Sequence, residues 1–294
     1  MLRIYLILLT GVVIVSSSSV IIRWTGDVPP TVIAFYRVFI SFCLLSIYRL
    51  SIKRDVHVLI RNWHWHYLLA GLFLAAHFIC WIGSLQLTTI ANAIFLESIH
   101  PLFGIIVSII FLKEYPQRNI FVIALLALFG MAVIMYNDIG HIGTHLTGDI
   151  LALFSALFFS LYILIARLHR EEEDFTKYLI YVYGTAAAAC AGYIILSTDS
   201  FSGYSNNSWL FMVILALGPN LLGHSILNWS SRHLKIFKVN LVILFEPILA
   251  TLSGIIFLAE YPPANFYPGA IMILAALAFL IWNEQRIIGR EKRE

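Results

Sequence analysis

The sequence predicts an all-α polytopic membrane protein whose ten transmembrane helices form two inverted five-helix repeats. Its composition is the first reason: of 294 residues, 60% are hydrophobic and only 12% are charged, with a mean hydropathy of +0.87. Soluble domains contain about 25% charged residues. The second reason is a series of apolar runs of about 20 residues along the whole chain, and the third is a motif that occurs twice.

The apolar runs are long enough to cross a hydrocarbon core of about 30 Å as helices. They predict ten spans, at residues 3–22, 30–50, 66–86, 89–112, 118–136, 148–168, 175–197, 209–230, 238–258 and 264–283. The connections are short, so no soluble domain is expected. The first span, preceded by Arg3, could be mistaken for a signal peptide. Its apolar stretch is too long, however, and Ser16 to Ser19 lead into no convincing cleavage site.

Lysine and arginine are unevenly distributed among the connections, which predicts the orientation. With a cytoplasmic N-terminus, all but two of the 19 lysines and arginines lie on the cytoplasmic side, the exceptions being Arg23 and Arg37. We therefore expect an integral protein of a bacterial inner (plasma) membrane, with both termini in the cytoplasm. The one acidic run, Glu171 to Asp174, is expected to be a solvated cytoplasmic loop rather than a cation or partner site.

A repeated motif reveals the internal symmetry of the chain. Residues 101–116 read PLFGIIVSIIFLKEYP and residues 247–262 read PILATLSGIIFLAEYP, at an offset of 146 residues. Residues 1–146 and 147–294 are therefore expected to be two copies of one five-helix unit. Because the number of spans per unit is odd, the second copy is inverted. Inverted repeats are typical of carriers that expose a central cavity to either side in turn, although channels also contain them.

In these motifs the sequence resembles the drug/metabolite transporter superfamily, in its EamA branch. The resemblance rests on the FLKEYP and FLAEYP segments, the prolines ahead of them, Tyr36-Arg37, and Gly148 to Leu153 followed by Ser155 to Leu157. It covers essentially the whole chain. It implies a ten-helix carrier with a central cavity lined by helices of both halves. The substrates it implies range over amino acids, nucleotide-like metabolites and organic cations.

Ionisable residues inside the spans are candidates for the site, because each charge near the bilayer centre costs about 2.5–3.5 kcal/mol. His100 and Glu246 occupy the same repeat position, each immediately before a proline. A proline within a helix frees a backbone carbonyl, which is tolerated at membrane depth only beside protein or a water-filled cavity. We therefore expect both residues at the cavity. Glu97 precedes His100 by three residues and lies on the same side of its helix.

The carboxyl groups are candidates for proton coupling. A carboxyl group withdrawn from water takes up a proton more readily, so we expect Glu246 first, and Glu97 second, to exchange protons for substrate. The alternative is a glutamate permanently paired with Arg37 or a histidine. Glu114 and Glu260, near the ends of the repeated motifs, are expected to end helices or to pair with a neighbouring loop, with gating as the alternative.

His77 and His224 lie at comparable places in the third and eighth spans, each followed within five residues by a tryptophan. Histidine titrates near physiological pH, so both are candidates for the cavity, with helix-to-helix hydrogen bonding as the alternative. Further candidates are side chains that could stack on a substrate or contact it through an amide: Tyr36, Trp81, Trp229 and Asn228. Packing or lipid contact is the alternative for the aromatic residues.

Several other functional classes lack their motifs in this sequence. It contains no Walker A motif, no GxSG or GxGD protease motif and no DDxxD. The three cysteines lie singly in apolar runs and the histidines lie on separate spans, so we expect no disulfide, metal site or cofactor. The scattered charges give no basic face for nucleic acid.

The expected function is therefore secondary active transport rather than catalysis. We expect alternating access for a small polar metabolite, an amino acid or related amine, with protons as the coupling ion. A multidrug or organic-cation proton antiporter is the first alternative. A membrane-embedded enzyme and a channel are the others, and a channel would be distinguished by non-saturable flux.

Overall fold

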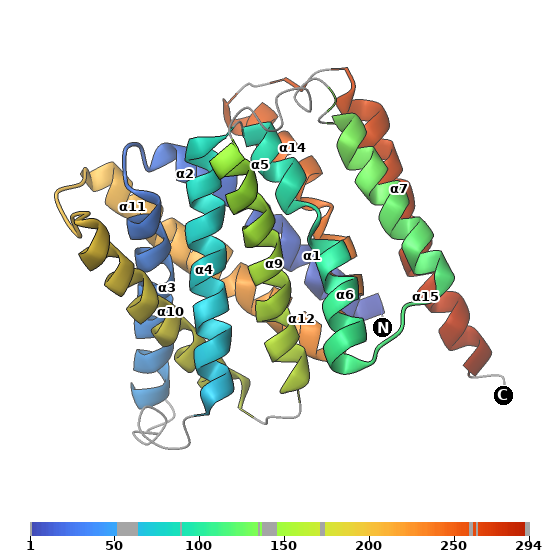
Figure 1. Cartoon of the computed structure of the whole chain (residues 1–294), viewed down its shortest axis with the longest axis horizontal. Coiled ribbons are helices and arrows are strands. Elements are labelled where there is room, and N and C mark those ends of the chain that lie inside the picture. Colours follow the sequence, from blue (N-terminus) through green and yellow to red (C-terminus); the bar gives the residue numbers. More distant parts are fainter. Residues whose placement is uncertain are drawn as a thin grey trace.

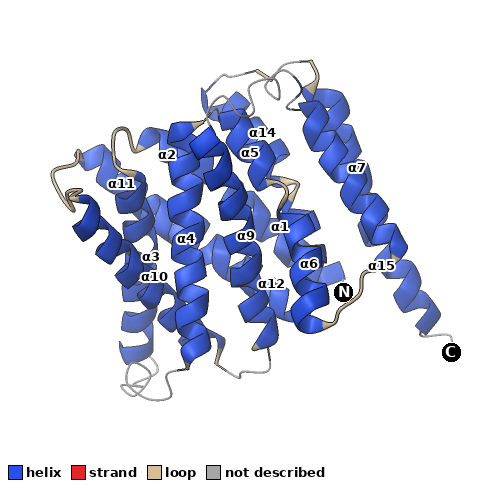
Figure 2. Ribbon diagram, viewed as in Figure 1, coloured by secondary structure: helices blue, strands red, loops and turns tan. Residues whose placement is uncertain are grey.

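The computed structural model is helical, as the sequence predicts (Figures 1 and 2). It describes residues 2–51, 64–88, 90–134, 136, 146–170, 174–258, 261–262 and 264–291. Within these ranges there is no strand. Each of the ten predicted spans coincides with one helix or with consecutive helical segments, so the predicted fold class is confirmed.

The two repeats contain the same order of helices. The first consists of α1 (Leu2–Ser16) and α2 (Ser18–Trp24), α3 (Pro30–Ser51), α4 (Trp65–Leu87), α5 (Ile90–Glu97) and α6 (His100–Leu112), and α7 (Arg118–Ile134). The second consists of α9 (Leu146–Leu168), α10 (Phe175–Ser197), α11 (Asn206–Leu215), the π-helix η2 (Ala216–His224) and α12 (Ser225–His233), α13 (Ile236–Ile243) and α14 (Glu246–Leu258), and α15 (Phe266–Glu291). Of the described spans, nine are long and apolar enough to cross a membrane, and α7 is a shorter apolar helix of 17 residues.

Two spans are interrupted at the positions that the repeated prolines predict. α5 ends at Glu97 and α6 begins at His100, while α13 ends at Ile243 and α14 begins at Glu246. In each case the proline occupies the first turn of the second segment, where its missing N–H breaks no helical hydrogen bond. The interruptions place Glu97, His100 and Glu246 at helix ends rather than in continuous helices.

Helices of the two repeats pack against one another. α4 lies along α9 and α10, α3 lies along α10, and α7 pairs with α15 at the edge of the molecule (Figure 1). The ends of α3, α6, α9 and α12 share one face, at the bottom of Figure 1. We call it the basic face, because many cationic side chains gather on it, including Arg49, Lys113, Arg167, Arg170, Arg232 and Lys235.

The glutamate of the FLKEYP motif, Glu114, follows the end of α6. Lys113, in a left-handed conformation with φ 54°, ends α6, so the chain does stop its helix at the FLKEYP motif. Glu114 pairs with Arg167 of α9, which is a helix of the other repeat and not a neighbouring loop. Glu260 and residues 171–173 of the acidic run lie outside the described residues.

The GDILAL run packs the start of α9 against the end of α4. A Cβ at Gly148 would lie 2.6 Å from the backbone carbon of Leu87 and 2.6 Å from the nitrogen of Thr88. Oγ1 of Thr88 donates a 2.6 Å hydrogen bond to Asp149. Only a residue without a Cβ allows this approach of two backbones.

We expect Gly148→Ala to lower the melting temperature in detergent, because backbone atoms cannot yield to the added methyl group and overpacking costs about 1–3 kcal/mol. Gly192→Ala is the matched control, since its Cβ would meet nothing within 4 Å. The control should melt at or above the wild-type temperature, because alanine favours a helix by up to about 1 kcal/mol over glycine. Equal melting temperatures for the two variants would contradict this assignment.

Candidate functional site

A small cavity lies between the two repeats. Two adjoining pockets form it, and both are bounded by Trp81, Glu97, Ile243 and Glu246. The first adds Arg37, His77 and His224, and the second adds His100. Together they are called the central cavity below. Their volumes are about 30 and 20 Å³, and one water molecule needs about 10–15 Å³. In this conformation the central cavity has room for a few water molecules but not for a metabolite.

Two carboxylates and one arginine meet at the central cavity. Arg37 is 1% exposed, and its guanidinium carbon lies 4.0 Å from the centre of the Phe78 ring. Arg37 and Glu246 interact electrostatically, and so do Glu246 and Glu97. Neither carboxylate takes part in an ion pair or side-chain hydrogen bond with a described residue.

Three buried histidines surround the ring of Phe159 on α9. The ring centres of His77, His100 and His224 lie 5.1, 5.7 and 6.2 Å from it. His77 contacts Ser155: its Nδ1 lies 2.9 Å from the Oγ of Ser155 and 3.1 Å from the carbonyl oxygen of Ser155. Nδ1 of His100 and Nδ1 of His224 have no partner among the described residues. Because an unsatisfied buried polar atom costs about 1–3 kcal/mol, both atoms are available to water or a ligand.

Helical spacing explains why one aromatic candidate reaches the central cavity and another does not. Trp81 follows His77 by four residues, which places both on one side of α4, and it lines both pockets. Tyr36 directly precedes Arg37, so it is turned by about 100° around the helix. Its hydroxyl donates a 2.8 Å hydrogen bond to the carbonyl of Phe201, away from the cavity.

The candidates on α12 lie outside the cavity lining. Trp229 follows His224 by five residues rather than four, and its ring packs 4.1 Å from that of His233. Asn228 is fully buried, and its side chain interacts with the Tyr162 hydroxyl. It does not line the central cavity.

Sequence reasoning missed the aromatic residues that organise the site. The ring of Phe78 packs against Arg37, and the ring of Phe159 packs against the three histidines. Phenylalanine is common in every span, so neither residue stood out. Only Ser155 carried a signal, as the first residue of the SAL segment after GDILAL.

Comparison with known proteins agrees with this architecture. The sequence profile of the EamA-like transporter family matches residues 2–136 and 146–282. An uncharacterized transporter from Archaeoglobus fulgidus is 21% identical over 206 residues, which is 69% of this chain and 71% of that protein. One crystal structure has the same fold, with a TM-score of 0.80 and 20% identity over 94% of this chain and 96% of the other. The chain belongs to the EamA-like transporter family and is an integral membrane transporter.

Proposed function

We propose that this protein is a proton-coupled secondary transporter of a small amino compound, an amino acid or related amine, in a bacterial inner membrane. Residues 1–146 and 147–294 are the two repeats, and the basic face, with both termini, lies in the cytoplasm. The observation that carries the proposal is the charge content of the central cavity, where Glu97 and Glu246 face a single arginine, Arg37.

An amino acid complements these charges. Its ammonium group suits the two carboxylates, its carboxylate suits Arg37, and charge-assisted hydrogen bonds of this kind are about twice as strong as neutral ones. With Arg37 balancing one carboxylate, the other still needs a positive charge when it is out of water. A proton or the substrate ammonium can supply that charge, but not both at once. This competition would couple proton movement to substrate movement.

The size of the central cavity supports alternating access. A cavity that holds water alone admits a substrate only after the two repeats separate on one side of the membrane. Inverted repeats provide two similar units for such an exchange of shape. A channel, by contrast, needs a path that is continuous across the membrane.

A panel of ligands tests the proposed substrate class. We expect amino acids or related amines to raise the melting temperature of the protein in detergent, and nucleosides to leave it unchanged. A ligand at 100 times its Kd stabilises the folded state by about 2.7 kcal/mol. Saturable uptake of the same compound into proteoliposomes would then separate a carrier from a channel. A shift produced by nucleosides alone would contradict the proposed substrate.

An organic-cation proton antiporter is the second candidate function. Trp81 and Phe78 beside the carboxylates favour it, because aromatic faces attract cations. For this function lipophilic cations would raise the melting temperature and amino acids would not.

A further inference from the structure

The helix α6 of the first repeat is attached to the second repeat at both of its ends. At its first residue, the carbonyl oxygen of His100 accepts hydrogen bonds from Oγ of Ser160 on α9 and Nδ2 of Asn240 on α13, each at 3.1 Å. Gly104 makes room for this contact, since a Cβ there would lie 2.3 Å from the Asn240 nitrogen. All four residues are buried.

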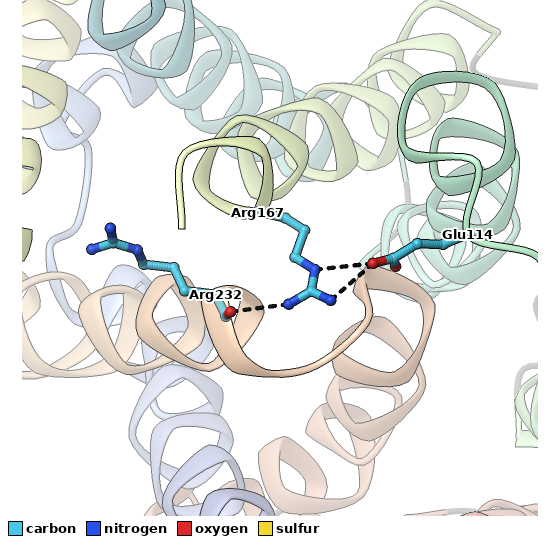
Figure 3. Close-up of polar contacts among 3 residues, drawn as sticks. All are labelled: Glu114, Arg167 and Arg232. Atoms are coloured by element: carbon cyan, nitrogen blue, oxygen red, sulfur yellow. Dashed lines mark hydrogen bonds and ion pairs between the residues drawn. The ribbon is translucent and has the colours of Figure 1, made fainter. Parts of the chain in front are cut away.

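At its other end, α6 is held by a charged contact at the basic face (Figure 3). Nη2 and Nε of Arg167 on α9 donate to Glu114 at 2.8 and 3.3 Å. Nη1 of Arg167 donates to the carbonyl of Arg232, near the end of α12, at 2.9 Å. The side chains of Arg167 and Glu114 are only 9% and 16% exposed, so water and salt screen their attraction weakly.

The polar contact at the start of α6 is specific to one repeat. The position of Asn240 corresponds to Ile94 in the first repeat, 146 residues earlier, and isoleucine cannot donate such a hydrogen bond. Ile94 instead lines the central cavity together with Ser19 of α2 and Ala250 of α14. The cavity thus extends towards the face opposite the basic face, whereas α6 starts at the cavity with His100 and runs towards the basic face.

We propose that α6 is the gate of the transporter at the basic face, and that Asn240 and Arg167 are positioning residues that hold this gate shut. The proposal rests on the transport function proposed above. His100 connects the site to the gate, because its ring lines the central cavity while its carbonyl accepts the hydrogen bonds from α9 and α13. A ligand that moves the His100 ring weakens the attachment of α6, and release of both ends opens a path to the basic face.

Cysteine labelling without substrate tests the gate. Ser108 is a fully buried residue of α6, so Ser108→Cys, in a chain with Cys43, Cys80 and Cys190 replaced by alanine, reports opening. We expect Arg167→Gln to raise the labelling rate by a membrane-impermeant maleimide about tenfold, since a charged hydrogen bond contributes at least about 1.4 kcal/mol. Asn240→Leu, at the other end of α6, should raise the rate too. The increase should appear in vesicles that expose the basic face and not in vesicles of opposite orientation.

Two controls separate opening from unfolding. Arg49→Gln removes the ion pair between Arg49 on α3 and Asp174 at the start of α10. This ion pair also joins the two repeats at the basic face, but it does not involve α6. It should leave labelling at position 108 unchanged. In a parallel chain that keeps only the fully buried Cys190 of α10, Arg167→Gln should not increase labelling.

Unchanged labelling at position 108 in both Arg167→Gln and Asn240→Leu would overturn the gate, and so would an equal increase in Arg49→Gln. Because the measurement involves no substrate, these results would leave the proposed transport function untouched. Absence of transport with an intact response of the labelling rate would count against the transport function instead.

Discussion

Glu246→Gln is expected to abolish accumulation of substrate against its gradient in proteoliposomes energised by a pH gradient. If one proton exchanges for one substrate, each unit of pH difference drives about a tenfold accumulation, because one unit corresponds to about 1.4 kcal/mol. The amide of glutamine has the shape of the carboxyl group but cannot bind and release a proton. The variant should therefore bring the substrate only to equal concentrations on both sides.

Geometry is the reason to choose Glu246. It begins α14, borders both pockets of the central cavity and interacts electrostatically with Arg37 and Glu97. Asp199→Asn is the matched control. Asp199 accepts hydrogen bonds from Thr31 on α3 and from Ser197 at the end of α10. It lines neither pocket of the central cavity, so the Asp199→Asn variant should accumulate substrate as the wild type does. Accumulation by Glu246→Gln at the wild-type ratio would contradict the proton role.

Arg37→Gln is expected to weaken the binding of an amino acid about 100-fold and not to weaken the binding of its decarboxylated amine. Truncating one partner of a desolvated charge pair costs about 2–5 kcal/mol, and about 2.7 kcal/mol corresponds to 100-fold. Arg37 is the cation that lines the central cavity in the described part of the chain. Titration of each ligand by calorimetry would measure the two dissociation constants.

Arg37→Lys serves as the control for charge alone. It retains the positive charge but loses the planar fork that binds a carboxylate through two hydrogen bonds, so we expect an intermediate loss for the amino acid. Equal losses for the amino acid and the amine would show that Arg37 supports the fold of the site instead. Unchanged binding of the amino acid would contradict the carboxylate contact and favour the organic-cation antiporter.

Several features of the protein could be predicted from the sequence alone. The spans follow from the thickness of the bilayer and from the need to satisfy every backbone group inside it. The offset of 146 residues between PLFGIIVSIIFLKEYP and PILATLSGIIFLAEYP indicated the inverted repeats. The prolines after His100 and Glu246 located the helix interruptions, because a missing N–H acts locally. The same prolines placed His100 and Glu246 at the central cavity, helical spacing added Glu97, and the comparable places of His77 and His224 in the two repeats made them candidates. All five line the cavity, together with Arg37.

The tertiary structure decided which side of each helix meets which neighbour. Trp81 faces the central cavity, whereas Tyr36 and Trp229 face elsewhere, although the sequence ranked them alike. Glu114 pairs with Arg167, 53 residues away in the chain. The physical reason is that hydrophobicity inside a bilayer drives helices into the membrane but does not orient them. Packing and interhelical hydrogen bonds orient them, and both depend on residues that are distant in sequence.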